Sequence, residues 1–197
     1  METQTESVDL VGDEAAANLA RAALFAALVG AFAYVSFPNP VSPAPVTLQV
    51  LGVFLAGIML GPVWGGVALA LYLFAGALGA PVFASGGAGF GALVGSTAGY
   101  LWSYPLAAAL IGAVVHRGTE LRDLRGPGAV GLPTLVGAMV AGTVLIYAMG
   151  VLGLYYVIPE FTLAEAVLQG AVVFVPAEGI KIAAAVGIVR SDAVTAA

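Results

Sequence analysis

Two charged residues stand out because they interrupt an apolar stretch near the C-terminal end of the chain. Glu178 and Lys181 lie in the segment Phe174-Val175-Pro176-Ala177-Glu178-Gly179-Ile180-Lys181, and Lys181 is the only lysine among 197 residues. Their i,i+3 spacing places both side chains on one face of a helix, close enough to neutralise each other. Charged residues inside apolar spans are costly to insert and usually mark a functional site. We expect the pair to face a ligand; the alternative is a salt bridge that only joins helices.

The chain lacks the residue patterns of the common hydrolytic sites. It has one histidine, no cysteine, no paired aspartates within its apolar runs, and no G-x-x-x-x-G-K-[ST], H-E-x-x-H or G-x-S-x-G motif. ATP hydrolysis and metal- or serine-dependent hydrolysis therefore lack their usual groups. No basic stripe suggests nucleic-acid binding. We expect no metal, no cofactor and no enzyme activity, and an intramembrane enzyme using Glu178 as acid or base is the weakest hypothesis.

Uncharged polar and aromatic residues are weaker candidates for ligand contacts. Gln49 lies near the start of the second apolar run, where it can hydrogen-bond a ligand or satisfy a helix end. Tyr72, within the third run, needs a partner when buried, and that partner is either substrate or another helix. Tyr100, Trp102 and Tyr104 cluster at the start of the fourth run. Such aromatic residues usually form an interfacial belt, although they can also stack on a ligand.

Small residues form two further patterns. The segment Phe83–Gly95 is rich in glycine, and its central residues Gly86, Gly87 and Ala88 belong either to a flexible outer loop or to a wall that closes over a ligand. The first apolar run carries small residues at four-residue spacing on two adjacent faces, Ala22, Ala26 and Gly30 on one and Ala23, Ala27 and Ala31 on the other. Such faces allow close helix packing, so they can dock a partner or pack internally.

These residues must be positioned within a membrane. Hydrophobic residues make up 61% of the chain and charged residues 9%, which is far below the roughly 25% charged residues of soluble domains. We expect an all-α integral membrane protein with six spans. The apolar runs are Asn18–Phe37, Val46–Leu60, Trp64–Leu78, Thr97–Val115, Leu132–Tyr155 and Leu163–Val189. The last run exceeds the roughly 20 residues that a span needs, so we expect a break near Val175-Pro176.

The arginines predict the orientation of this bundle. In a six-span arrangement all five fall on the face shared by the termini: Arg21, Arg117, Arg122, Arg125 and Arg190. The positive-inside rule then places both termini in the cytoplasm, and the protein in the cell membrane in contact with lipid. We expect an acidic disordered cytoplasmic tail over residues 1–17, a single six-helix membrane domain over 18–190 and a short tail over 191–197.

Several motifs resemble the BioY family, the biotin-binding S-components of energy-coupling factor (ECF) transporters. They occur in the family's order along nearly the whole chain: Pro45-Val46-Thr47-Leu48-Gln49-Val50-Leu51-Gly52-Val53, Ala56-Gly57-Ile58-Met59-Leu60-Gly61-Pro62, Gly76-Ala77-Leu78-Gly79-Ala80-Pro81-Val82-Phe83, Gly86-Gly87-Ala88-Gly89, Gly95-Ser96-Thr97-Ala98-Gly99-Tyr100-Leu101 and Pro176-Ala177-Glu178-Gly179-Ile180-Lys181. The chain departs from the family at Glu178, which replaces aspartate. It also departs at Ala88 and Leu101, where some members have asparagine and arginine, and at Ser96, which replaces a common proline.

The resemblance implies a six-helix S-component that binds biotin from outside and works with a transmembrane coupling protein and two ATPase subunits. It implies docking through Ala22, Ala23, Ala26 and Ala27, and biotin contacts from Glu178, Lys181 and the Gly86 to Gly89 segment. The carboxylate of biotin suits Lys181 or a helix N-terminus, and its ureido N–H groups suit Glu178 or Gln49. An S-component or stand-alone carrier for another small carboxylated vitamin is the alternative function.

Overall fold

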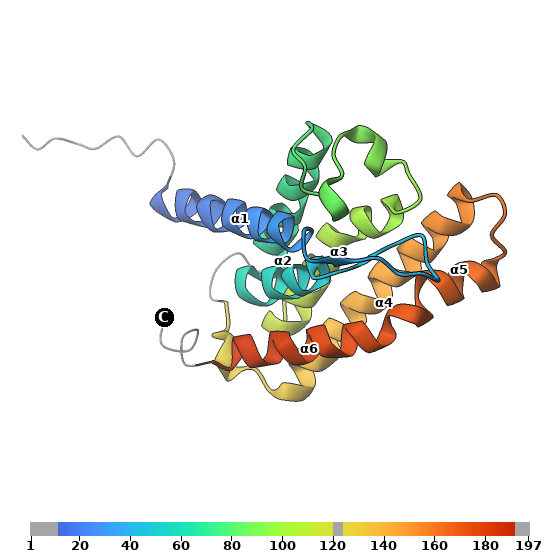
Figure 1. Ribbon diagram of the computed structural model, residues 1–197. Helices are drawn as coiled ribbons and strands as arrows, with labels where there is room; N and C mark the ends of the chain where they lie inside the picture. The colour runs from blue at the N-terminus through green and yellow to red at the C-terminus, as the bar shows by residue number, and fades with distance from the viewer. Residues whose placement is uncertain (1–11, 120–123, 192–197) are drawn as a thin grey trace, which may run out of the picture.

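The computed structural model describes residues 12–119 and 124–191, which form a bundle of helices (Figure 1). The helices are α1 (Asp13–Phe32), α2 (Gln49–Ala77), α3 (Ala98–His116), α4 (Leu132–Val157), α5 (Leu163–Gly170) and α6 (Val175–Val189). Within the described residues, five helical stretches are long and apolar enough to cross a membrane, with α5 and α6 counted together as one of them. The helical membrane architecture expected from the apolar runs is therefore confirmed.

α2 changes direction within its length, because Gly61 adopts φ 74° and ψ −176° and thereby leaves the helical conformation. Pro62 follows at once, where its fixed φ suits the start of a new helical segment. Beyond this break the backbone of Gly65 packs against the carbonyl of Ala56. The two halves of α2 correspond to the second and third apolar runs, so the boundary expected at Gly61-Pro62 is confirmed.

A second break divides the last apolar run. α5 ends at Gly170, Ala171 has the non-helical pair φ −134° and ψ −58°, and a 3₁₀ turn η4 (Val172–Phe174) leads into α6. Pro176 occupies the first turn of α6, where proline is tolerated because no backbone N–H is required there. This break lies within a few residues of the predicted position, and it places Glu178 and Lys181 in the first two turns of α6.

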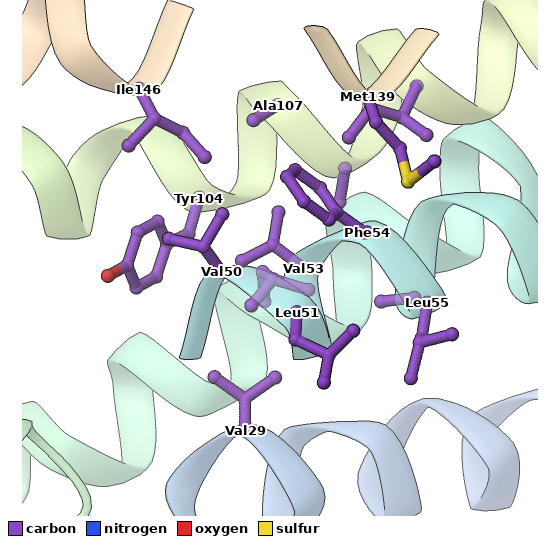
Figure 2. Packing of buried hydrophobic residues seen from close by; sticks show 14 of the residues in the cluster. Val29, Val50, Leu51, Val53, Phe54, Leu55, Tyr104, Ala107, Met139 and Ile146 are labelled. Carbon is purple, nitrogen blue, oxygen red and sulfur yellow. The ribbon is translucent and has the colours of Figure 1, made fainter. Parts of the chain in front are cut away.

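The first half of α2 forms the centre of the bundle. Every residue of this half is buried except Met59, which is partly exposed. Figure 2 shows Val50, Val53 and Phe54 of α2 between Val29 of α1 on one side and Met139 of α4 on the other. A membrane span is apolar all round wherever it lies, so composition alone does not explain this position. At Gly52 and Gly57 a Cβ would collide with Val29 of α1 and with the Ala108 carbonyl of α3, so these glycines let both helices pack closely against α2.

The connection from α1 to α2 contains a short β pair that the all-helical prediction omitted. β1 (Ser36–Phe37) pairs antiparallel with β2 (Val46–Thr47). The loop between these strands reaches across the bundle toward α5, and Pro40 to Pro43 line a shallow groove together with Leu168 and Gln169 (Figure 1). The first apolar run was expected to extend to Phe37, and this is corrected: α1 ends at Phe32, because Ser36 and Phe37 are extended and pair with β2.

The predicted N-terminal tail also needs a correction. α1 begins at Asp13, so residues 13–17 are helical rather than part of a disordered tail. Alanine is the strongest helix former, and the three consecutive alanines Ala15, Ala16 and Ala17 extend the helix toward the N-terminus. Residues 1–11 and 192–197, where the rest of the two predicted tails falls, lie outside the described part of the chain.

Candidate ligand-binding site

A cavity of about 210 Å³ lies at the end of the bundle where α2, α3 and α6 begin. Its walls come from the loop before β2, the start of α2, the connection between α2 and α3, the first turns of α3, the middle of α4 and the region where η4 meets α6. The lining residues are Ala44, Pro45, Val46, Thr47, Gln49, Val50, Phe83, Ala84, Gly87, Ala92, Thr97, Tyr100, Leu101, Tyr104, Ile146, Tyr147, Phe174 and Lys181.

Aromatic side chains form much of the cavity wall. Tyr100 and Tyr104 are one helical turn apart on α3, so both face inward. Tyr147 of α4 meets Tyr100 edge-on with ring centroids 6.0 Å apart, and it stacks on Phe174 at 5.7 Å. Figure 2 shows the ring of Tyr104 beside Val50 with its hydroxyl pointing away from Phe54. These rings offer flat apolar surfaces for a ring-shaped ligand.

Tyr100 is held in place by two contacts. Its hydroxyl donates a 2.6 Å hydrogen bond to the carbonyl oxygen of Gly170, the last residue of α5. Its ring lies on the backbone of Gly150, where any side chain would collide with the ring. Gly150 therefore lets α3 approach α4 closely and fixes the aromatic wall between them.

The charged pair adjoins the cavity through a hydrogen-bond cluster. Lys181 Nζ donates to Glu178 Oε1 over 2.6 Å, and the Tyr147 hydroxyl donates to the same oxygen over 2.7 Å. Lys181 and Tyr147 line the cavity, and Glu178 lies behind them. Glu178 Oε2 is buried and has no hydrogen-bond partner among the described residues. The pair is thus an internal salt bridge with one member at the cavity surface.

A neutral polar cluster faces the cavity from the start of α2. The Thr47 hydroxyl donates to Gln49 Oε1 over 3.1 Å, and Gln49 Nε2 donates to the Tyr72 hydroxyl over 2.5 Å. Thr47 and Gln49 line the cavity, whereas Tyr72 is buried behind Gln49 with its ring edge-on to Phe83. Tyr72 therefore orients Gln49 and is not among the residues that line the cavity, although it was predicted to contact the ligand.

The glycine-rich segment contributes Phe83, Ala84 and Gly87 to the cavity. Phe83 N donates to the Gly87 carbonyl over 3.0 Å, and Gly86 N donates to the Phe83 carbonyl over the same distance. This small loop points Gly87 inward and leaves Ala88 exposed. Gly86 and Ala88 were expected at the ligand and instead adjoin the lining residue Gly87, because Gly86 turns the chain at φ 79°.

The same segment is tied to the end of α1. The Tyr34 hydroxyl donates to the carbonyl of Pro81 over 2.6 Å, and the hydroxyls of Ser36 and Ser85 lie 3.3 Å apart. Ser85 N also donates to the carbonyl of Ala33 over 3.4 Å. These hydrogen bonds fix the position of the glycine-rich segment, which forms part of the cavity wall next to the start of β1.

Sequence reasoning missed several residues of the wall. Tyr104 was left between an interfacial belt and a stacking role and was not named as a site residue, yet it is buried and lines the cavity. Trp102, between the two tyrosines, is 48% exposed and donates to the Leu93 carbonyl. The i,i+4 spacing of Tyr100 and Tyr104 was the available signal. Tyr147 is one of three tyrosines in α4, and only the fold brings it to Glu178.

The predicted docking residues divide between two sides of α1. Ala22 is fully buried and Ala26 is half-buried against the core, whereas Ala23 and Ala27 are exposed. Ala22 and Ala26 thus pack inside the chain, because Val29 and Ala33 continue the same buried stripe. Of the four predicted docking residues, Ala23 and Ala27 are the two that lie exposed on α1, and docking through them stays a prediction.

The described residues contain no group of three or more histidine, cysteine, aspartate or glutamate side chains able to hold a metal ion. The groups that face the cavity are hydroxyls, one amide, one paired ammonium and aromatic rings. Such a mixture of apolar walls and a few polar groups binds a small organic molecule by shape and hydrogen bonding.

The family model and the similar proteins point to one family. The model of the BioY family matches residues 2–196. A protein of Thermotoga maritima named biotin transporter BioY is 36% identical over 168 residues, covering 85% of this chain and 90% of its own length. A biotin transporter BioY of Rhodobacter capsulatus is 39% identical over 140 residues, covering 71% and 70% respectively.

A solved structure shares the fold. The crystal structure of the S-component for biotin from an ECF-type ABC transporter superposes with a TM-score of 0.80, covering 92% of this chain and 93% of the other. Sequence identity with that protein is 22%, so this likeness concerns the fold alone.

Proposed function

This chain belongs to the BioY family, and we propose that it binds biotin for uptake across the cell membrane as the S-component of an ECF-type transporter. The cavity between α2, α3, α4 and α6 is the observation that carries this function. Its aromatic wall suits the fused rings of biotin, and Thr47, Gln49 and Lys181 supply hydrogen-bonding groups for the ureido end. The chain captures the vitamin and does not transform it.

Biotin is favoured over another carboxylated vitamin by two observations together. The relatives that match most of this chain are named biotin transporters. The cavity combines several aromatic rings with a small set of hydrogen-bonding groups. This balance suits a compact bicyclic ligand with an apolar side chain, since most of its surface is buried against apolar side chains.

We propose six membrane crossings with both termini in the cytoplasm. The break at Gly61 supports the count, because it turns α2 into two segments that lie against each other at Gly65 and Ala56. Arg117 ends α3 and Arg190 ends α6, at the ends of these helices that are remote from the cavity. If this end faces the cytoplasm, the cavity opens toward the outside, as uptake requires.

Active import requires partners, because the sequence contains no ATP-hydrolysing motif. A transmembrane coupling protein and ATPase subunits supply this step in an ECF-type transporter. We place the docking surface on the exposed side of α1 at Ala23 and Ala27, where small side chains allow a partner helix to approach closely.

Uptake of radiolabelled biotin by cells that lack their own biotin transporter tests the function. Cells producing this chain with a coupling protein and ATPase subunits should accumulate biotin, and an excess of unlabelled biotin should abolish the signal. Accumulation no higher than in cells producing the partners alone would contradict the proposal. An excess of a different carboxylated vitamin serves as the specificity control.

A further inference from the structure

The charges around the cavity constrain how an anionic ligand can lie in it. Lys181 is the one charged residue among the described residues that line the cavity. Its ammonium is already paired with Glu178 Oε1 at 2.6 Å, and both side chains are 4–5% exposed. Lys181 and Glu178 therefore form a neutral pair, and the lining offers no unpaired positive charge within the described chain.

The other described cations lie elsewhere. Arg117 and Arg190 end their helices at the far end of the bundle, and the Arg190 guanidinium donates to the carbonyl of Val130 over 2.8 Å. Arg125 lies at the same end of the bundle, since its backbone N–H donates to His116 at the end of α3. Arg21 lies in α1, which contributes no residue to the cavity.

The backbone N–H groups at helix N-termini near the cavity largely have hydrogen-bond partners within the chain. The N–H of Ala98 donates to the Gly95 carbonyl, and the N–H of Tyr100 donates to the Thr97 carbonyl, so a preceding turn uses the first donors of α3. Before α6, Phe174 and Val175 both have right-handed helical dihedrals, and η4 runs directly into the helix. The start of α6 is therefore not a free helix end, so it is not the helix N-terminus that suits the biotin carboxylate.

A buried carboxylate would be unfavourable in these surroundings. Transferring an anion out of water costs several kcal/mol unless a charge compensates it. A ligand carboxylate placed next to Lys181 would also repel the carboxylate of Glu178, which is already paired with the Lys181 ammonium. A neutral acceptor avoids both penalties. An ammonium has three donors, and Glu178 accepts one of the three from Lys181, so a ureido carbonyl can accept another.

We propose that this cavity recognises the uncharged ureido ring of biotin and forms no ion pair with its carboxylate, so that uncharged side-chain derivatives such as biotin amide are ligands of the same class. The inference rests on the proposed function, since it concerns how biotin lies in this cavity. It assigns the carboxylate to the mouth of the cavity, where water and backbone groups remain available to solvate it.

Competition binding on the purified wild-type chain tests this inference without any substitution. Labelled biotin is displaced by biotin, by biotin amide and by a biotin derivative alkylated on a ureido nitrogen, each at low and at high salt. We expect biotin amide to bind within about tenfold of biotin, at both salt concentrations. The ureido-alkylated derivative should bind more than about tenfold weaker, because the ring end is buried.

The outcomes separate the inference from the function. If biotin binds and the amide binds more than about tenfold weaker, an ion pair with the carboxylate exists and the inference is wrong, although the function stands. Biotin binding that weakens steeply with salt, or undiminished binding of the ureido-alkylated derivative, would overturn it as well. If labelled biotin itself does not bind, the proposed function fails and the inference fails with it.

Discussion

Lys181 Nζ lies 2.6 Å from Glu178 Oε1, in the first two turns of α6, and both side chains are shielded from solvent. A third residue, Tyr147 of α4, donates its hydroxyl to the same carboxylate oxygen. The pair therefore joins α6 to α4 and presents Lys181 to the cavity. The two readings of these charges from the sequence, a ligand-facing pair and an internal salt bridge, describe two aspects of one arrangement.

Removing one member of the pair should destabilise the protein strongly. Lys181→Met leaves the Glu178 carboxylate buried without a counter-charge, which typically costs about 3–5 kcal/mol in the free energy of unfolding. Lys181→Met combined with Glu178→Gln removes both charges and should recover most of this loss. Thermal unfolding in detergent measures both variants. Equal stability of wild type and Lys181→Met would show that the pair is not buried as described.

The hydroxyl of Tyr147 should stabilise the protein through its hydrogen bond to Glu178. Tyr147→Phe keeps the ring stacked on Phe174 and removes one donor to the carboxylate, with an expected loss of about 1.5–3 kcal/mol in stability. Biotin affinity should fall as well, because Glu178, the partner of Lys181, loses one of the two donors that hold its carboxylate in place. Tyr156→Phe is the matched control, since Tyr156 is 79% exposed. Equal effects of the two substitutions would remove Tyr147 from the cluster.

The break in α2 should depend on glycine at position 61. Gly61→Ala places a Cβ where φ is 74° and ψ is −176°, a conformation that costs about 1–3 kcal/mol for other residues, and this Cβ would press on the Leu124 side chain. Gly137→Ala is the control, because an added Cβ there meets no atom within 4 Å. Thermal unfolding of both variants tests this, and a Gly61→Ala protein as stable as the control would argue against the break.

Docking should depend on the exposed side of α1. Phenylalanine at Ala23 and Ala27 should abolish co-purification with the coupling protein and ATPase subunits while biotin binding is retained, because both side chains point away from the core. The same substitution at the exposed Ala148 of α4 should leave the complex intact. An intact complex with the α1 variant would show that this face does not dock the partners.

The fold was largely predictable because its signals are local. Each apolar run yields a helical segment, although the first begins and ends five residues earlier than expected. Gly61, Pro62 and Pro176 mark breaks through their own backbone preferences. The β1–β2 pair was not predictable, since each strand has two residues and their pairing depends on a loop crossing the bundle.

The site was predictable only in part, for a different reason. Glu178, Lys181 and Gln49 were recognisable because polar groups are rare in this chain, and each one belongs to or adjoins the cavity. Tyr104, Tyr147 and Phe174 are ordinary members of apolar helices, and their role arises from packing between helices. Tyr72 shows the converse, because its hydroxyl accepts a hydrogen bond from Gln49 and does not line the cavity.

Titration calorimetry of biotin into the purified chain measures whether this cavity is the biotin site. We expect a single site per chain with a dissociation constant below micromolar, and binding weakened by more than about tenfold when Gln49→Leu and Thr47→Val remove the polar groups of β2 and α2 from the cavity. Affinity weaker than micromolar in the wild type, or unchanged affinity in a folded double variant, would contradict the assignment of this cavity as the biotin site.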